Sequence, residues 1–311
     1  AENDRGKFSI IVKSLESGRE KTILRSGTRV IGQRVDYSVP LIDWADANTL
    51  GVVGVKQGAY WFWLYDLSTQ SRLPRELDKF NTIRSLRFSD NGRLAILSAD
   101  FEGRNDLYLL STRRDRTRRL TNDSFDDLDP SFIPGTNKIV FSSNRTSDSL
   151  KTGKRVALAE LTNQYNLFVF DLDSTQNQLT RVTNTLSKDY SPQALDSDTF
   201  YYLSDQRGIV NLFKYDRKTG IYTQVTNYSS SIVSYDLNAS SKTFAFVTSK
   251  NLEQNIYVDK NFDIKRQVFT PATRRKELQQ ARTIRERKVV NENKGMSVKE
   301  LLNARLKAAA S

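Results

Sequence analysis

The sequence predicts an all-β fold, a six-bladed β-propeller of four-stranded antiparallel blades, followed by a C-terminal α-helical tail. Short runs of alternating apolar and polar residues are bounded by Gly, Pro, Asn, Asp and Ser, which is typical of consecutive antiparallel strands. These runs also repeat: Asn166, Asn211 and Asn255 begin equivalent strands and are 45 and 44 residues apart. Four-stranded propeller blades have repeats of roughly 40–50 residues.

Independent features keep the same spacing. The fourth strand of a repeat ends in Leu120-Thr121-Asn122, Val182-Thr183-Asn184 and Val225-Thr226-Asn227. We therefore predict a propeller over residues 1–270, with blades at residues 7–25, 39–77, 82–121, 128–183, 189–226 and 232–269. Five blades are expected to be complete, and the sixth is expected to end in a strand over residues 264–270. The first blade shows only two strands, so we expect its other two upstream of Ala1, in a longer chain.

The tail over residues 271–311 is basic and is predicted to be helical. It holds 11 Lys or Arg and four Glu, a large share of the net charge of +12. Thr270 followed by Pro271 predicts a helix start, and Ser297 with Glu300 forms a capping box for a second one. Val298, Leu301, Leu302 and Leu306 form an apolar stripe. Because the tail lacks aromatic residues and has this stripe, we expect it to dock on protein rather than bind nucleic acid.

Composition excludes several kinds of site. The chain has no His and no Cys, which rules out disulfides, thiol nucleophiles, Ser-His-Asp triads and histidine-ligated zinc. No apolar run has the roughly 18 residues that a membrane-spanning helix needs. The run Asp126-Asp127-Leu128-Asp129 lacks the order of a calcium loop. We therefore expect no metal, no cofactor, no transmembrane segment and no catalytic motif.

The fourth blade resembles the repeat of TolB-type, WD40-like propellers of bacterial envelopes. The matching segments are Asp129-Pro130-Ser131-Phe132, Pro134-Gly135, Ile139-Val140-Phe141 and Ser142-Ser143-Asn144-Arg145. The resemblance covers about residues 82–270, and more loosely begins at residue 7. It implies a non-catalytic scaffold that binds another protein of an envelope assembly, in the periplasm or elsewhere outside the cytoplasm. The same repeat also occurs in peptidase gating domains.

Two alternatives to this function remain open. The chain could be an accessory or gating propeller of a multidomain hydrolase whose catalytic domain lies outside these 311 residues. It could also be a glycan-binding or glycan-cleaving propeller that uses carboxylates, Tyr and Arg. The aromatic residues of the second blade fit a glycan platform, but strand alternation favours packing between blades. These residues are Trp44, Tyr60, Trp61, Phe62, Trp63 and Tyr65.

Two groups of residues are the candidates for partner binding. The first group lies on loops at one end of the predicted channel and consists of Arg104, Asp126, Asp127, Asp129, Arg145, Asp189 and Arg207. These residues form either a charged rim that binds a partner or ion pairs that hold neighbouring blades together. The second group is the insertion at residues 146–164, which interrupts the repeat. Its candidate contacts are Arg155, Val156, Leu158 and Leu161, and long loops of this kind are often functional.

Overall fold

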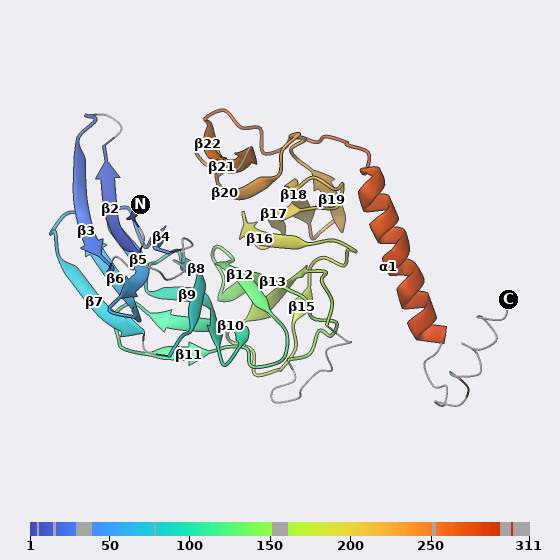
Figure 1. Cartoon of the computed structure of the whole chain (residues 1–311), viewed down its shortest axis with the longest axis horizontal. Coiled ribbons are helices and arrows are strands. Elements are labelled where there is room, and N and C mark those ends of the chain that lie inside the picture. The colour runs from blue at the N-terminus through green and yellow to red at the C-terminus, as the bar shows by residue number, and fades with distance from the viewer. Residues whose placement is uncertain are drawn as a thin grey trace.

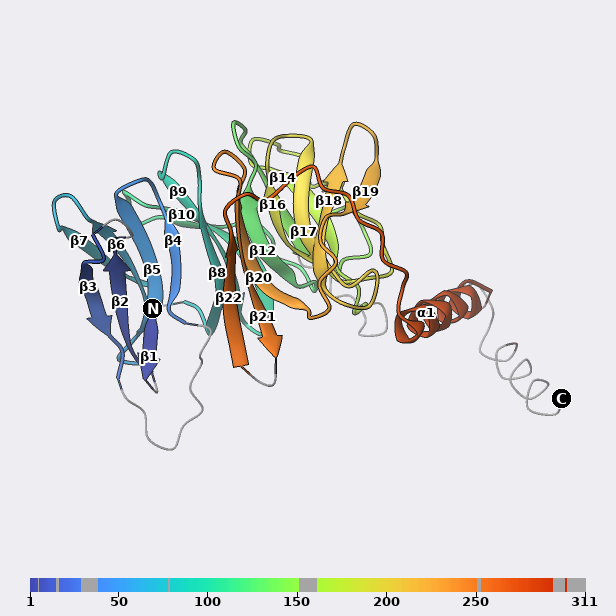
Figure 2. The same ribbon diagram turned by 90° about the horizontal axis from the view of Figure 1, so that it is seen from above.

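The computed structural model describes residues 1–4, 6–14, 17–28, 39–77, 79–150, 161–250, 253–292 and 300. In these residues antiparallel sheets follow one another in chain order around an open arc, and a single long helix projects from its end (Figures 1 and 2). The predictions of an all-β propeller and of a C-terminal helix are confirmed. The count of complete blades is not, because four of the described sheets have four strands and two have three.

The strands fall into sheets that we number in chain order. The first sheet holds β1 (Glu2–Asp4), β2 (Lys7–Lys13) and β3 (Glu20–Ser26), and the second holds β4 (Leu41–Trp44), β5 (Thr49–Lys56), β6 (Ala59–Asp66) and β7 (Arg72–Leu77). The third holds β8 (Thr82–Phe88), β9 (Leu94–Phe101), β10 (Arg104–Ser111) and β11 (Thr117–Arg119). The fourth holds β12 (Asp127–Phe132), β13 (Lys138–Ser143), β14 (Asn166–Asp171) and β15 (Thr180–Arg181). The fifth holds β16 (Asp189–Ala194), β17 (Thr199–Ser204), β18 (Asn211–Asp216) and β19 (Ile221–Gln224), and the sixth holds β20 (Ile232–Asn238), β21 (Thr243–Lys250) and β22 (Glu253–Asp259).

The repeated threonine has one local task in three sheets. Its hydroxyl accepts a hydrogen bond from the backbone N–H of a leucine in the third strand and donates one to the side chain of the residue before that leucine. The accepted bonds are Leu107 N to Thr121 Oγ1 (3.0 Å), Leu167 N to Thr183 Oγ1 (2.9 Å) and Leu212 N to Thr226 Oγ1 (2.9 Å). The donated bonds end on Asp106, Asn166 and Asn211. This bond satisfies buried backbone donors where the third and fourth strands diverge, which explains the periodic sequence signal.

Consecutive sheets pack face to face through buried apolar residues. Each of the five buried clusters among the described residues joins one sheet to the next in the chain. Aromatic rings dominate: Phe141 and Phe168 are fully buried, as are Phe200 and Tyr202. Burying a side chain of this size contributes about 1.5–3 kcal/mol. Hydrogen bonds join the fourth and fifth sheets as well, since Ser142 Oγ donates to the carbonyl of Asp189 at 2.6 Å.

Two glycines of β5 make room for these rings. A Cβ on Gly51 would lie 2.2 Å from the ring of Phe88, and one on Gly54 would lie 2.5 Å from the ring of Phe8. A larger residue at either position would therefore force the facing ring, or the sheet that carries it, to shift. The second sheet can pack closely on the first and third sheets because Gly51 and Gly54 have no side chain.

The end of the sixth sheet differs from the prediction. Residues 264–270 were expected to form its fourth strand, but Val268 N donates to the carbonyl of Gln224 on β19 at 2.9 Å. The chain turns back because Phe262 is buried and stacks on Phe244, with ring centroids 4.4 Å apart. The predicted fourth strand of this blade is therefore wrong, and β22 is the last strand of the sheet.

The helix α1 (Arg274–Glu292) is attached through its first turn. Thr273 caps it by accepting a bond from Lys276 N at 3.3 Å, so the predicted cap, Thr270, is wrong. Lys276 is buried and its Nζ lies 2.8 Å from Asp205 on the loop after β17. The predicted second helix start lies outside the described residues apart from Glu300. No helix in the described part of the chain is long and apolar enough to cross a membrane.

Candidate binding site in the central channel

A cavity of about 510 Å³ lies where the first strands of five sheets converge. Its lining comes from β4, β8, β12, β16 and β20 and from the turns that follow three of them. These are the innermost strands, so the cavity is the central channel of the propeller. Ligand sites in proteins are typically concave and few in number, and we take this channel as the candidate site.

The lining of the channel is acidic. Five of the described lining residues are aspartates and one is a cation: Asp43, Asp46, Asp90, Asp129 and Asp236 against Arg87. The guanidinium of Arg87 lies 3.3 Å from Asp43, whose other carboxylate oxygen accepts a bond from Phe88 N at 2.9 Å. Burial raises the pKa of Asp43, against the lowering effect of Arg87. One guanidinium therefore compensates only part of the channel's negative charge.

Backbone strain accompanies this charge at two repeat-equivalent positions. Asp129 and Ser191 each precede a proline, lie in a register shift of the first strand and have positive φ, +49° and +50°. Non-glycine residues seldom adopt this conformation, and such strain tends to occur at functional sites. The two residues are joined, because Asp129 Oδ2 accepts hydrogen bonds from Ser191 N and Oγ, both at 3.1 Å. Burial raises the pKa of Asp129, although these bonds lower it.

Two hydroxyl groups in the lining have no hydrogen-bond partner among the described residues. They are the buried oxygens of Ser85 on β8 and Tyr235 on β20. A buried polar group without a partner costs about 1–3 kcal/mol. Either group can donate to or accept from a ligand that enters the channel. The channel therefore combines excess negative charge with unused hydrogen-bonding capacity, which suits a cationic group that carries several N–H donors.

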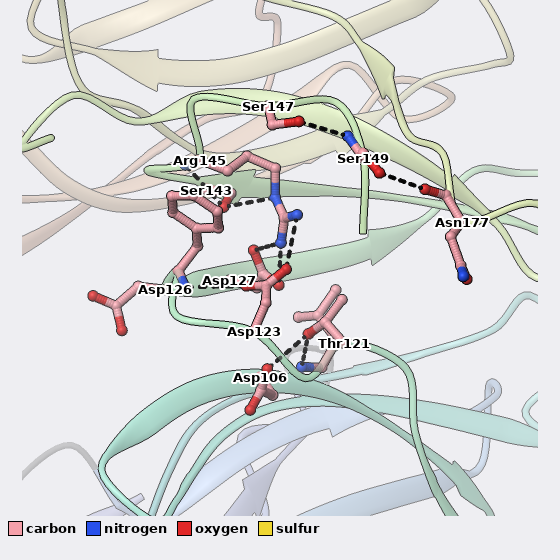
Figure 3. A network of polar contacts seen from close by, with 12 residues as sticks. Asp106, Thr121, Asp123, Asp126, Asp127, Ser143, Arg145, Ser147, Ser149 and Asn177 are labelled. Carbon is pink, nitrogen blue, oxygen red and sulfur yellow. Dashed lines mark hydrogen bonds and ion pairs between the residues drawn. The ribbon is translucent and has the colours of Figure 1, made fainter. Parts of the chain in front are cut away.

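The predicted rim residues are divided between different environments. Only Asp129 lines the channel. Arg145 and Asp127 are buried together between the third and fourth sheets, as Figure 3 shows. Arg145 Nη2 lies 2.7 Å from both carboxylate oxygens of Asp127, and Nη1 lies 3.1 Å from Asp123. The side chain of Arg145 has no exposed surface. In this structure the ion pairs of Arg145 with Asp123 and Asp127 therefore join parts of the propeller and do not face a partner.

The remaining rim residues also have partners within the chain. Arg104 donates to the carbonyl of Asp123 at 3.2 Å, and Asp126 accepts from Asn105 at 2.7 Å. Asp189 is buried and accepts from Ser204 and Thr185. Arg207 lies over the ring of Phe269, 5.1 Å from its centroid. A role for these residues in partner binding stays a prediction.

The insertion is described only at its two ends. Leu150 is buried in the cluster between the third and fourth sheets, and its N–H donates to the carbonyl of Asn177 at 2.9 Å. Asp148 accepts from Arg181 at 2.7 Å. Leu161 is half-buried. The predicted contacts Arg155, Val156 and Leu158 lie outside the described residues.

The aromatic residues of the second sheet are mostly packed between sheets, as strand alternation predicted. Tyr60, Phe62, Trp63 and Tyr65 are buried. Trp44 is the exception, because half of its surface is exposed and it lines the channel. In the described part of the chain, no group of three carboxylates is placed to hold a metal ion.

Sequence reasoning missed most of the polar residues of the channel lining. Those that were not singled out as site candidates include Asp43, Asp46, Ser85, Arg87, Asp90, Ser191, Tyr235 and Asp236. One signal was available. The segments Asp127-Leu128-Asp129-Pro130 and Asp189-Tyr190-Ser191-Pro192 share a pattern in which the residue before proline faces the channel.

Comparison with known proteins supports the fold. Neither a protein-family model nor a curated protein matches the chain. Among solved structures, TolB from Acinetobacter baumannii has a TM-score of 0.58 at 16% identity, and the match covers 81% of this chain and 57% of that one. A putative TolB from Agrobacterium tumefaciens has a TM-score of 0.58 at 13% identity, with coverage of 84% and 88%. The β-propeller domain of the trilobed protease from Pyrococcus furiosus, which has an open velcro topology, has a TM-score of 0.53 at 14% identity, with coverage of 87% and 78%.

The fold is therefore a TolB-like β-propeller. The chain spans 57% of the length of the Acinetobacter protein. Identities of this size establish similarity of fold alone, and the neighbours include a propeller from a protease.

Proposed function

We propose that this chain is a non-catalytic propeller that binds a segment of a partner protein at its central channel, as part of a bacterial envelope complex outside the cytoplasm. The observation that carries the proposal is the acidic channel: five aspartates against one arginine, with two unused hydroxyls. A lysine or arginine side chain of the partner would supply the missing positive charge and N–H donors. The exposed Trp44 beside these carboxylates adds an aromatic face for a cationic group.

The insertion at residues 146–164 is a second candidate for contact with the partner. Residues 146–150 are held to β15 and to the turn before it by the bonds of Asp148 with Arg181 and of Leu150 with Asn177, so a deletion should spare them. We propose that the insertion at residues 146–164 adds further contacts with the partner. The TolB-like fold is the reason for placing the complex in the periplasm.

Charge reversal in the channel tests this function. Asp236 is exposed in the lining, so Asp236→Lys changes the channel charge without disturbing the core. Like charges brought together at an interface cost several kcal/mol. We expect affinity purification from an envelope extract to recover at least about tenfold less partner with Asp236→Lys than with the unaltered chain.

Glu253→Lys is the matched control, because it makes the same charge change at an exposed position on β22, outside the channel lining. Partner recovery should be unchanged for this control. Equal recovery by Asp236→Lys and the unaltered chain would show that the channel does not bind the partner.

A further inference from the structure

Besides the acidic channel, the propeller has a groove on its outside, between the outer strands of the second and third sheets. This groove is basic. It has a volume of about 700 Å³ and is lined by residues of β7, of the link to β8 and of the turn before β11. Its ionisable lining residues among those described are Arg75, Lys79 and Arg116 against Glu76 and Asp115. Asp78 lies outside the described residues.

Arg75 is the centre of this groove because its hydrogen bonds are incomplete. Its Nη1 donates to the carbonyls of Ser111 and Arg114, at 2.9 and 2.6 Å. Its Nε and Nη2 are buried and have no hydrogen-bond partner among the described residues. Nε and Nη2 lie on one edge of the planar guanidinium, where two parallel N–H groups can bind two oxygens of one anion.

The position of this edge is fixed in advance. The two backbone carbonyls hold one side of the guanidinium, and its carbon lies 5.5 Å from the centre of the Phe62 ring. A side chain already held in place loses little conformational freedom when a ligand binds. Burial lowers the pKa of Arg75, against the raising effect of Asp115, so an anion at this edge would relieve a desolvated charge.

Asp115 is the carboxylate that forms an ion pair with Arg75 in the described part of the chain, and it does not complete the edge. Its Oδ1 is 3.8 Å from Arg75 Nε, which exceeds a hydrogen bond, and 88% of its side chain is exposed. An exposed ion pair of this length contributes little. A ligand anion can displace this carboxylate into water.

The surrounding surface adds positive charge. The turn that closes the groove carries Arg113, Arg114 and Arg116, and β11 adds Arg118; all four are exposed. Exposed arginines around a concave site raise the local concentration of anions. The acidic channel has the opposite charge, so the two sites take ligands of opposite sign.

We propose that this groove binds a phosphate group, with two of its oxygens on the Nε and Nη2 edge of Arg75 and with Lys79 and Arg116 as further cationic contacts. Phosphate fits because its oxygens match the arginine edge in a bidentate manner. The phosphate can belong to a free phosphate compound or to a phospholipid headgroup. This site is separate from the proposed protein-binding function and does not depend on it.

Titration with inorganic phosphate at low ionic strength, followed by calorimetry, tests the site on the full chain. Arg75→Lys keeps the charge but loses the paired N–H edge, and we expect it to weaken binding on the order of tenfold or more. Arg113→Lys is the matched control on the same turn and should bind as the unaltered chain does. Asp115→Asn removes the competing carboxylate and should tighten binding on the order of fivefold.

Three results would overturn the proposal. One is the absence of saturable phosphate binding by the unaltered chain. Another is equal binding by Arg75→Lys and Arg113→Lys. The third is a lower melting temperature of Asp115→Asn with no change in phosphate binding, which would make Asp115 the structural partner of Arg75. Arg116→Gln, at an exposed position, should also weaken binding, and it provides a second reading if Arg75→Lys fails to fold.

A vesicle pelleting experiment distinguishes a phospholipid headgroup from a soluble phosphate compound. Vesicles of phosphatidylcholine with and without phosphatidic acid are pelleted with each variant. If only vesicles with phosphatidic acid retain the chain, and Arg75→Lys abolishes retention, the ligand is a headgroup. If inorganic phosphate binds in an Arg75-dependent manner and neither vesicle retains the chain, the ligand is a soluble phosphate compound.

Discussion

Asp127 and Asp189 occupy the same place in successive sheets but have different partners. Each begins the first strand of its sheet, is fully buried and pairs with a serine of the second strand, Ser143 or Ser204. Two residues after that serine, the chain has Arg145 in one sheet and Gln206 in the next. Asp127 therefore faces a buried guanidinium, whereas Asp189 accepts bonds from Ser204 at 2.6 Å and Thr185 at 2.8 Å.

The difference shows two ways to keep a carboxylate in an apolar interface. A buried ion pair is stabilising only while both partners are present, because either one alone is an uncompensated charge. Hydroxyl donors are neutral, so no buried cation is left when the carboxylate is removed. They also stabilise the negative charge of the carboxylate less than a guanidinium does. Burial raises the pKa of Asp189, against the lowering effect of its hydroxyl donors. The two interfaces should therefore respond differently to the same substitution.

The largest expected effect is at Arg145. Arg145→Met removes the guanidinium and leaves Asp123 and Asp127 buried without a cation, so we expect the free energy of unfolding to fall by about 3–5 kcal/mol. Gln206→Met, at the equivalent position in the next sheet, should cost about 1 kcal/mol or less. Urea denaturation measures both. Equal losses would show that Arg145 contributes through packing rather than charge.

A smaller effect, with different outcomes in the two sheets, is expected from replacing each aspartate by asparagine. Asp127→Asn should lower the free energy of unfolding by about 2–3 kcal/mol at neutral pH, because Arg145 keeps only Asp123. Asp189→Asn should leave it unchanged or raise it by up to about 1 kcal/mol, because a buried charge is lost and the hydroxyls can still bond. Thermal melts of the two variants would contradict this account if both fell by the same amount.

The smallest expected effect is a pH dependence in the third sheet. Burial raises the pKa of Asp106 to about 6, while the bond from Arg119 lowers it. An unfolded aspartate titrates at about 4, so between about pH 4 and pH 6 the folded state binds more protons. Stability from this group is therefore present below about pH 4 and is lost as pH rises to about 6. Allowing for solvent screening, we expect about 1 kcal/mol.

Asp106→Asn is the control for this pH dependence. Asn166 and Asn211 already hold the equivalent positions in the next two sheets and accept the same threonine bond. The variant should lose the decline in stability between about pH 4 and pH 6. An unchanged pH profile would show that another group causes the decline.

The repeat could be read from the sequence because it reflects local chemistry. Thr121, Thr183 and Thr226 each clip a third strand to the segment beside it, so the motif keeps its spacing wherever the blade is built. A local pattern does not show which strand a segment will pair with. The segment at 264–270 has a strand-like pattern, yet Val268 pairs with Gln224 because Phe262 turns the chain back.

The candidate site was harder to predict than the fold. Asp126, Asp127 and Asp129 are close in sequence but have separate environments, because the register shift between Leu128 and Ser131 turns Asp129 into the channel. The shift is indicated in the sequence only by the pattern that Asp129-Pro130 shares with Ser191-Pro192. The channel lining is also collected from five strands that are far apart in the chain, and no local pattern identifies Tyr235 or Asp236 as members of it.

The order of the buried clusters has a consequence for how this propeller comes apart. Each cluster among the described residues joins consecutive sheets, and none combines residues of the first and sixth. Within the described residues the sheets form a linear array, for which we expect stability to be a sum of nearest-neighbour terms. Detaching a terminal sheet breaks one interface, whereas removing a central one breaks two. We therefore expect unfolding to proceed inward by fraying, with the sheets around Arg145 the last to open.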